Sequence, residues 1–130
     1  MPHLQFEINK KIDNQSKKSF CKKIRDSFSR IMDTQTYHIA ISIREYEPFN
    51  LSIGRVEMGE EVCLMNLDIR QGRTIEQRRE LALVYMSIVS EEFNIPNSNQ
   101  YITFTQHEGE DFHLIEKYLS SWESGEDPLA

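Results

Sequence analysis

The sequence has few cysteines and no long apolar run. Only two cysteines, Cys21 and Cys63, occur among 130 residues. Two cysteines without metal-ligand spacing predict neither a disulfide framework nor a zinc site, so we expect two reduced thiols in a cytoplasmic protein. No apolar stretch approaches the roughly 20 residues that span a bilayer, and the charges of Glu7, Lys10 and Lys11 exclude the apolar segment of a signal peptide. We therefore expect no membrane contact.

Acidic residues outnumber basic ones, 21 to 15, so the formal net charge is −6. An acidic protein is a poor nucleic-acid binder, although lysines and arginines gather in residues 10–30. At helical spacing, the basic residues of this segment lie opposite its apolar ones. The basic set is Lys17, Lys18, Lys22, Lys23 and Arg25, and the apolar set is Phe20, Ile24, Phe28 and Ile31. This pattern favours a solvated helix face over a phosphate-binding patch, and we expect no nucleic-acid partner.

Proline is the second residue, and it begins a segment with the pattern of a strand. Leu4, Phe6 and Ile8 alternate with polar residues, which places them on one face. If Met1 is removed, the free secondary amine of Pro2 becomes a nucleophile and a base. An α-amino group titrates near about 7.7 to 8.0, and burial near cations lowers that pKa into the range of a general base. The alternative is that Pro2 follows the initiator methionine without chemical purpose.

The first half of the chain reads as strand, helix and strand. Asp13 or Asn14 caps a helix expected over about 15–33, and residues 38–46 alternate as a second strand that Pro48 stops. Residues 49–60 indicate a short hairpin or an irregular crossover.

The second half repeats this order. Residues 62–69 form an apolar strand, and Thr74 with Gln77 makes a capping box that opens a helix reaching Phe93. The apolar stripe of that helix is Ile75, Leu81, Val84, Tyr85, Ile88 and Val89. A further strand is expected over 101–106. A short amphipathic turn follows in the acidic tail, with Phe112, Leu114, Ile115, Tyr118 and Trp122.

The order predicts an α+β fold of one domain over residues 1–130. Two consecutive β-α-β units, about 2–46 and 61–107, would form a four-stranded mixed sheet with two helices on one face, followed by a tail over 108–130. We expect apolar side chains on the uncovered sheet face. Burying that face in a closed ring of identical subunits predicts a homotrimer.

Two short motifs carry a resemblance to a known family. Gly72-Arg73-Thr74, followed by Glu76-Gln77, resembles the Gly-Arg-Ser/Thr turn of 4-oxalocrotonate tautomerase and its relatives. The run from Arg70 to Arg73 has the two-arginine spacing of cis-3-chloroacrylic acid dehalogenases. With Pro2 and the repeated β-α-β order, the chain is similar to the tautomerase superfamily, whose members carry a catalytic amino-terminal proline and assemble as hexamers or trimers.

The resemblance implies an isomerase that moves a proton in a small 2-keto acid or its enol. Pro2 would be the general base, and Arg70 and Arg73 would hold the carboxylate, for which the arginine fork is suited. The dehalogenases activate water with a histidine and a tyrosine, where this chain has Phe28 and Phe104. Malonate semialdehyde decarboxylases use an aspartate ahead of the second strand, where residues 34–37 carry no carboxylate. The open alternatives are a hydratase, dehalogenase or decarboxylase of a small unsaturated or keto acid, and a non-catalytic trimeric binding module.

Further polar residues are candidates for the mouth of the pocket. His107 or Glu108 would donate a proton to the substrate oxygen, in the same or an adjacent subunit. The alternative for residues 107–113 is a solvated acidic loop, and their loop spacing is weak evidence for a metal, so we expect no metal and no cofactor. His38 and Phe104 are further pocket candidates, His38 because relatives place a cationic or polar residue there.

Overall fold

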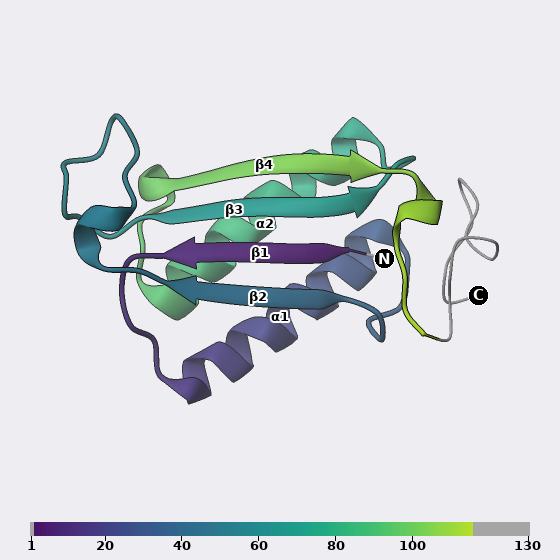
Figure 1. Ribbon diagram of the computed structural model, residues 1–130, viewed down its shortest axis with the longest axis horizontal. Helices are drawn as coiled ribbons and strands as arrows, with labels where there is room; N and C mark the ends of the chain where they lie inside the picture. The colour runs from purple at the N-terminus through teal and green to yellow at the C-terminus, as the bar shows by residue number, and fades with distance from the viewer. Residues whose placement is uncertain (1, 116–130) are drawn as a thin grey trace.

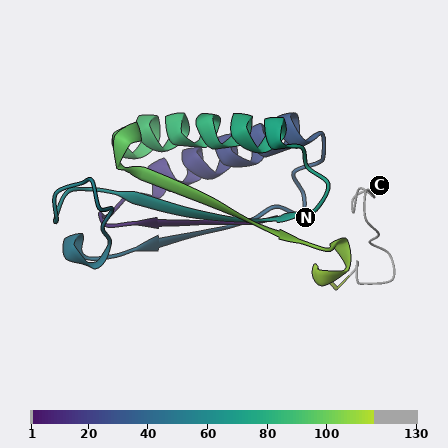
Figure 2. The same ribbon diagram turned by 90° about the horizontal axis from the view of Figure 1, so that it is seen from above.

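The protein is a two-layer α/β sandwich, seen in a computed structural model that describes residues 2–115. A four-stranded sheet forms one layer, with strands β1 (His3–Ile8), β2 (Ala40–Glu45), β3 (Cys63–Arg70) and β4 (Gln100–His107). Helices α1 (Asn14–Met32) and α2 (Ile75–Phe93) lie side by side on one face of the sheet (Figures 1 and 2). Three 3-10 turns complete the elements: η1 (Pro48–Asn50), η2 (Asn97–Asn99) and η3 (Gly109–Asp111).

The strand order β2-β1-β3-β4 arises from two β-α-β units. Within each unit the strands run parallel, β1 with β2 and β3 with β4, whereas the central pair β1 and β3 is antiparallel. The predicted fold class, a mixed four-stranded sheet with both helices on one face, is therefore confirmed. The extent of a single domain over residues 1–130 stays a prediction. Tyr118 and Trp122 of the expected amphipathic turn lie outside the described residues.

The core lies between the sheet and the helices. Alternate residues of the central strand β1, Leu4, Phe6 and Ile8, are fully buried. The Phe6 ring meets Phe20 of α1 edge-on at 4.9 Å between centroids, and Phe20 stacks on Phe93 of α2 at 4.4 Å. Such aromatic pairs stabilise the fold beyond the burial of apolar area, so they contribute to the packing of both helices against the sheet.

The helix ends follow local capping rules. The Asp13 side chain accepts a hydrogen bond from the Ser16 backbone N–H, and Thr74 with Gln77 forms the predicted capping box. Left-handed residues follow both helices, Asp33 and Asn94. The predicted helix boundaries are therefore correct to about one residue.

Two details of the predicted pattern are wrong. Ile75, assigned to the buried stripe of α2, is 41% exposed because the first helical residue extends beyond the edge of the core. The second strand starts at Ala40 and not at residue 38, because Ala40 is the first residue of the ladder with β1.

The uncovered sheet face is polar, which corrects the expectation of an apolar one. Most of the residues that alternate with the core positions carry hydrogen-bonding side chains, which pair with one another across the strands, whereas Ala40, Leu64 and Tyr101 are the less polar positions of this face. The paired residues are His3, Gln5, Glu7, Ser42, Arg44, Asn66, Asp68, Thr103, Thr105 and His107. The alternation in the strands is thus polar against apolar, as in a sheet with one solvated face.

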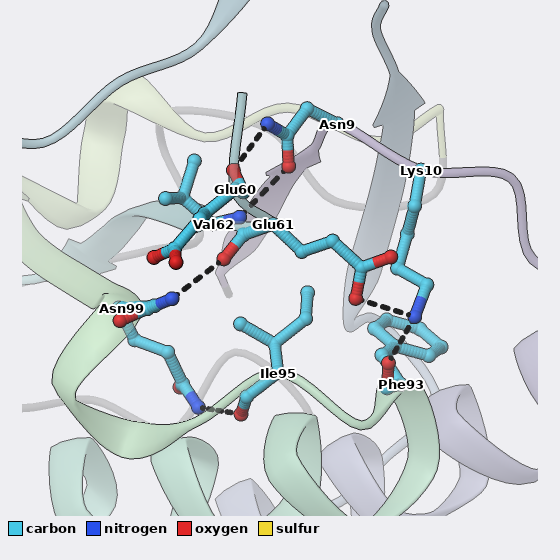
Figure 3. Close-up of polar contacts among 9 residues, drawn as sticks. Asn9, Lys10, Glu60, Glu61, Val62, Phe93, Ile95 and Asn99 are labelled. Atoms are coloured by element: carbon cyan, nitrogen blue, oxygen red, sulfur yellow. Dashed lines mark hydrogen bonds and ion pairs between the residues drawn. The ribbon is translucent and has the colours of Figure 1, made fainter. Parts of the chain in front are cut away.

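The link between the two units is the irregular crossover, one of the two predicted alternatives. Apart from η1, residues 46–62 contain no helix or strand. Asn9, which is 2% exposed, holds this crossover: its Nδ2 donates to the carbonyls of Pro48 and Glu60, and its Oδ1 accepts from the Val62 N–H (the bonds to Glu60 and Val62 are drawn in Figure 3). Because all these partners are backbone groups, one side chain replaces the ladder that a hairpin would have supplied.

A lysine beside Asn9 ties the same region to the second helix. Lys10 Nζ donates to the Glu61 carboxylate and to the carbonyl of Phe93, at the C-terminal end of α2 (Figure 3). A cation at this position complements the helix dipole.

The basic face of α1 is paired with carboxylates. Lys17 contacts Glu45 at 3.0 Å, and Lys22 contacts Asp26 at 2.7 Å. The Lys23 ammonium lies 2.7 Å from Glu92, and this hydrogen bond lowers the pKa of the Glu92 carboxyl. These contacts favour a solvated helix face over a phosphate-binding patch. In residues 2–115, neither helix is long and apolar enough to cross a membrane.

Both cysteines are free thiols. Cys63 is buried in β3, and burial raises its pKa to about 12. Burial also raises the pKa of Cys21, whose side chain packs against the core. Because the thiolate is the reactive form, both are packing residues in the folded protein.

Candidate functional site

One end of the sheet gathers most of the candidate residues. It is the end where β1 and β2 begin and where β3 and β4 finish, and the N-terminus lies there in Figure 1. Pro2 is buried at this end, and its carbonyl accepts a hydrogen bond from the Ala40 N–H at 3.1 Å. Because His3 pairs with Asp68 in the antiparallel ladder, Pro2 lies beside the residue that precedes Arg70.

Arg70 and His107 are neighbours across the last two strands. Arg70 is the final residue of β3, is only 4% exposed, and pairs in register with His107 at the end of β4. The hydrogen bond from the Gln71 N–H to the His107 carbonyl, at 2.8 Å, continues this pairing into the turn. The topology thus brings Pro2, Arg70 and His107 to one end of the sheet, although they are far apart in sequence.

Arg73 follows in the turn between β3 and α2 and reaches toward the first helix. Its Nη1 donates to the carbonyl of Met32 at 2.7 Å, and the neighbouring Gln77 Nε2 donates to the carbonyl of Ile31 at 3.2 Å. These carbonyls belong to the last turn of α1 and have no partner within the helix. The Arg73 charge also complements the negative end of the α1 dipole. Arg73 therefore has a structural contact in addition to the proposed one with substrate.

The remaining candidates are placed around this end. His38 lies in the loop before β2, two residues from Ala40, and its ring meets Tyr37 edge-on at 4.9 Å. Glu108 directly follows β4, is exposed, and its carbonyl accepts from the Asp111 N–H as η3 begins. Phe104 pairs in register with Leu67 and packs against the core. It is thus on the helix-covered face, opposite to the face of Asp68 and His107.

Asp68 is a functional candidate that the sequence patterns do not predict. The Asp68 carboxylate lies 3.0 Å from His107 Nε2, and its other oxygen accepts from Gln5 Nε2 at 2.6 Å. The Gln5 Oε1 accepts in turn from Arg44 Nη1 at 3.0 Å. These four side chains therefore form one hydrogen-bonded row across all four strands, from β2 to β4. The available signal was the only carboxylate of a mainly apolar strand, two residues before Arg70.

No cluster of metal ligands accompanies this row. Among residues 2–115, no group of three or more histidine, cysteine, aspartate or glutamate side chains is placed to hold a metal ion. What the site offers chemically is the arginine cations, the His107 imidazole and the Asp68 carboxylate to which it is bonded, all near the start of the chain.

Comparisons with known proteins match in structure and not in sequence. No family model and no curated protein matches the chain. A solved structure named N1, a member of the cis-3-chloroacrylic acid dehalogenase family, superposes with a TM-score of 0.80 at 19% identity, over 95% of this chain and 85% of that one. A fused 4-OT, described as a symmetric trimer, gives a TM-score of 0.78 at 18% identity over 87% of this chain and 91% of that one. Macrophage migration inhibitory factor of Toxoplasma gondii gives 0.78 at 9% identity over 88% of this chain and 97% of its own.

Proposed function

Since this chain has the fold of the tautomerase superfamily, we propose that it is an isomerase that moves a proton in a small 2-keto acid or its enol. The observation that supports the proposal is that Pro2 and Arg70 lie at the same end of the sheet, as follows from the register of β1 against β3. A base that takes a proton from carbon and a fixed cation that holds the carboxylate are sufficient for keto-enol conversion of a 2-keto acid.

In the proposed reaction the nitrogen of Pro2, freed by removal of Met1, takes a proton from the carbon next to the keto group. The electrons of the broken C–H bond form the C=C bond of the enol, the π electrons of the C=O bond move to the keto oxygen, and that oxygen takes a proton from an acid of the pocket or from water. The guanidinium of Arg70, held at the end of β3 with 4% exposure, would bind the substrate carboxylate, and Arg73 would assist. Partial burial strengthens such a contact because water screens it less.

The direct test is tautomerisation of phenylpyruvate by protein that begins at Pro2. Intact-mass measurement of protein from its native source establishes whether Met1 is removed, since a retained Met1 acylates the proline nitrogen and removes its basicity. Protein that begins at Pro2 and does not convert phenylpyruvate or other small enolisable 2-keto acids would contradict the proposal and favour a non-catalytic binding module.

The arginines are expected to affect substrate binding. Arg70→Ala or Arg73→Ala should raise KM or lower kcat/KM by the value of a charge-assisted hydrogen bond, about 1.5 to 3 kcal/mol. Steady-state kinetics with phenylpyruvate measures this. A kinetically silent Arg73→Ala, alongside an inactive Pro2 variant, would show that Arg73 does not bind the carboxylate.

Arg73→Ala needs a control because Arg73 also caps α1. Gln77→Ala removes the neighbouring contact to the Ile31 carbonyl, and with it the capping box of α2, but no positive charge. It should lower the melting temperature and leave kcat/KM of the folded protein unchanged. If Gln77→Ala reduces kcat/KM as much as Arg73→Ala does, the effect of Arg73 is structural.

The pH profile distinguishes two ways to protonate the substrate oxygen. If His107 or Glu108 donates the proton, it must stay protonated while Pro2 is neutral, so kcat/KM should follow a bell-shaped curve. Without such an acid, the curve should rise once and level off. The measurement is the pH dependence of kcat/KM for the parent, His107→Ala and Glu108→Gln, and an unchanged basic limb in both variants would remove this segment from the mechanism.

We also propose that the protein assembles as a homotrimer. The support is the fused 4-OT structure, a symmetric trimer with the same fold, and not an apolar sheet face, because that face is polar. Analytical ultracentrifugation at micromolar concentration should give three times the monomer mass of 15.4 kDa. A stable monomer at that concentration would contradict the assembly.

A further inference from the structure

The contact between Asp68 and His107 defines the state of the histidine ring. The Oδ2 atom of Asp68 accepts from the amide nitrogen of Gln5 at 2.6 Å, and Asn66 Nδ2 lies 3.4 Å from the same oxygen. Amide nitrogens only donate, and an ionised carboxylate only accepts. Because these donors favour the ionised form of Asp68, we assign the proton in the 3.0 Å contact between Asp68 Oδ1 and His107 Nε2 to the histidine, which leaves Nδ1 as the ring nitrogen that is not bonded to Asp68.

The ring is also held in orientation. On one side it is bonded to Asp68, and on another it meets the ring of Phe112 edge-on, with centroids 5.5 Å apart. The side chain of His107 is 33% exposed, whereas that of Asp68 is 19% exposed. The histidine is thus accessible from solvent, and the carboxylate that fixes it is more enclosed.

The orientation of the Asp68 carboxylate is fixed by the hydrogen bond that its other oxygen accepts from Gln5. The Gln5 amide can hold only one orientation, because its oxygen accepts from Arg44 and its nitrogen donates to Asp68. The row ends at the strand position of His107, which is paired in register with Arg70. The only charged groups of the row besides the histidine are Arg44 at its far end and Asp68 in contact with the ring.

We propose that Asp68 is a positioning residue that holds His107 in the Nε2–H form, so that His107 exchanges the proton of the substrate oxygen through Nδ1. The inference rests on the proposed function, because it assigns His107 and not Glu108 as the acid of that site. The chemistry is that of a carboxylate–imidazole pair, in which the carboxylate selects the tautomer and does not itself react.

The first experiment reads the tautomer without reference to activity. Nitrogen-15 NMR of the His107 ring should show the Nε2–H form in the neutral ring of the full-length protein. In Asp68→Asn, the new amide can donate to Nε2, so the signals should shift toward the Nδ1–H form. Thr103→Val, on the same face of β4 and bonded to Asn66, is the matched control and should resemble the parent. An unchanged His107 tautomer in Asp68→Asn would overturn the proposal.

The second experiment tests whether the pair is used in the reaction. Asp68→Asn should lower kcat/KM for phenylpyruvate about tenfold or more, mainly through kcat, as loss of an orienting contact does. In the His107→Ala background the same change should have no further effect, since Asp68 acts through His107. A full Asp68→Asn effect in that background would overturn the proposal. The parent protein could instead be inactive on phenylpyruvate while the His107 tautomer still changes in Asp68→Asn. That result would overturn the proposed function and the role of His107 in the reaction, and it would confirm the hydrogen bond between Asp68 and His107.

Discussion

Blocking the nitrogen of Pro2 should reduce kcat/KM about 10²- to 10⁴-fold, the range that a positioned general base contributes. A protein with one glycine added before Pro2 has the same folded sequence but an amide in place of the amine, so it should lose this whole contribution. Pro2→Ala, also processed to begin at residue 2, keeps a primary amine and should lose less. The measurement is the initial rate with phenylpyruvate for the parent, the glycine-extended protein and Pro2→Ala.

The order of these rates is diagnostic, because the backbone contact at this position is kept in all of them. The carbonyl of residue 2 accepts from the Ala40 N–H whichever side chain is present. Circular dichroism should therefore show the same fold in each protein. A glycine-extended protein with the activity of the parent would exclude Pro2 as the base, even if both arginine variants are impaired.

Asn9→Ala should lower the free energy of unfolding by about 2 to 4 kcal/mol, because the Asn9 side chain makes three hydrogen bonds to backbone groups and each contributes about 0.5 to 1.5 kcal/mol. The groups are the carbonyls of Pro48 and Glu60 and the N–H of Val62, which is 1% exposed. Urea denaturation followed by fluorescence or circular dichroism measures the loss.

Asn99→Ala is the matched control for Asn9. Its side chain makes a single bond to the crossover, from Nδ2 to the Glu61 carbonyl at 3.0 Å, and is only half-buried (Figure 3). The expected loss is about 1 kcal/mol. Equal effects of the two variants would show that Asn9 does not hold the crossover. Asn9 follows the other end of β1, so kcat/KM of the folded Asn9→Ala protein should equal that of the parent.

Local signals in the sequence were sufficient for the elements and the fold class. Strand alternation in residues such as Leu4 and Phe6, and the capping box of Thr74 and Gln77, depend on neighbours a few residues apart. Two β-α-β units then allow few arrangements, because parallel crossovers are right-handed. The short motif around Arg70 and Arg73 also placed two arginines at the end of a strand without knowledge of the register.

Tertiary structure alone decided what those residues contact. The bonds of Asp68 to Gln5 and to His107 join residues 63 and 39 positions apart, and they exist only in the register that the sheet adopts. The capping of α1 by Arg73 spans 41 positions and depends on the side-by-side packing of the helices. Composition and periodicity determine which face of a strand is buried, since hydrophobicity is a property of each residue. Which polar side chains meet on the other face depends on the pairing of distant strands, and no local pattern encodes that pairing.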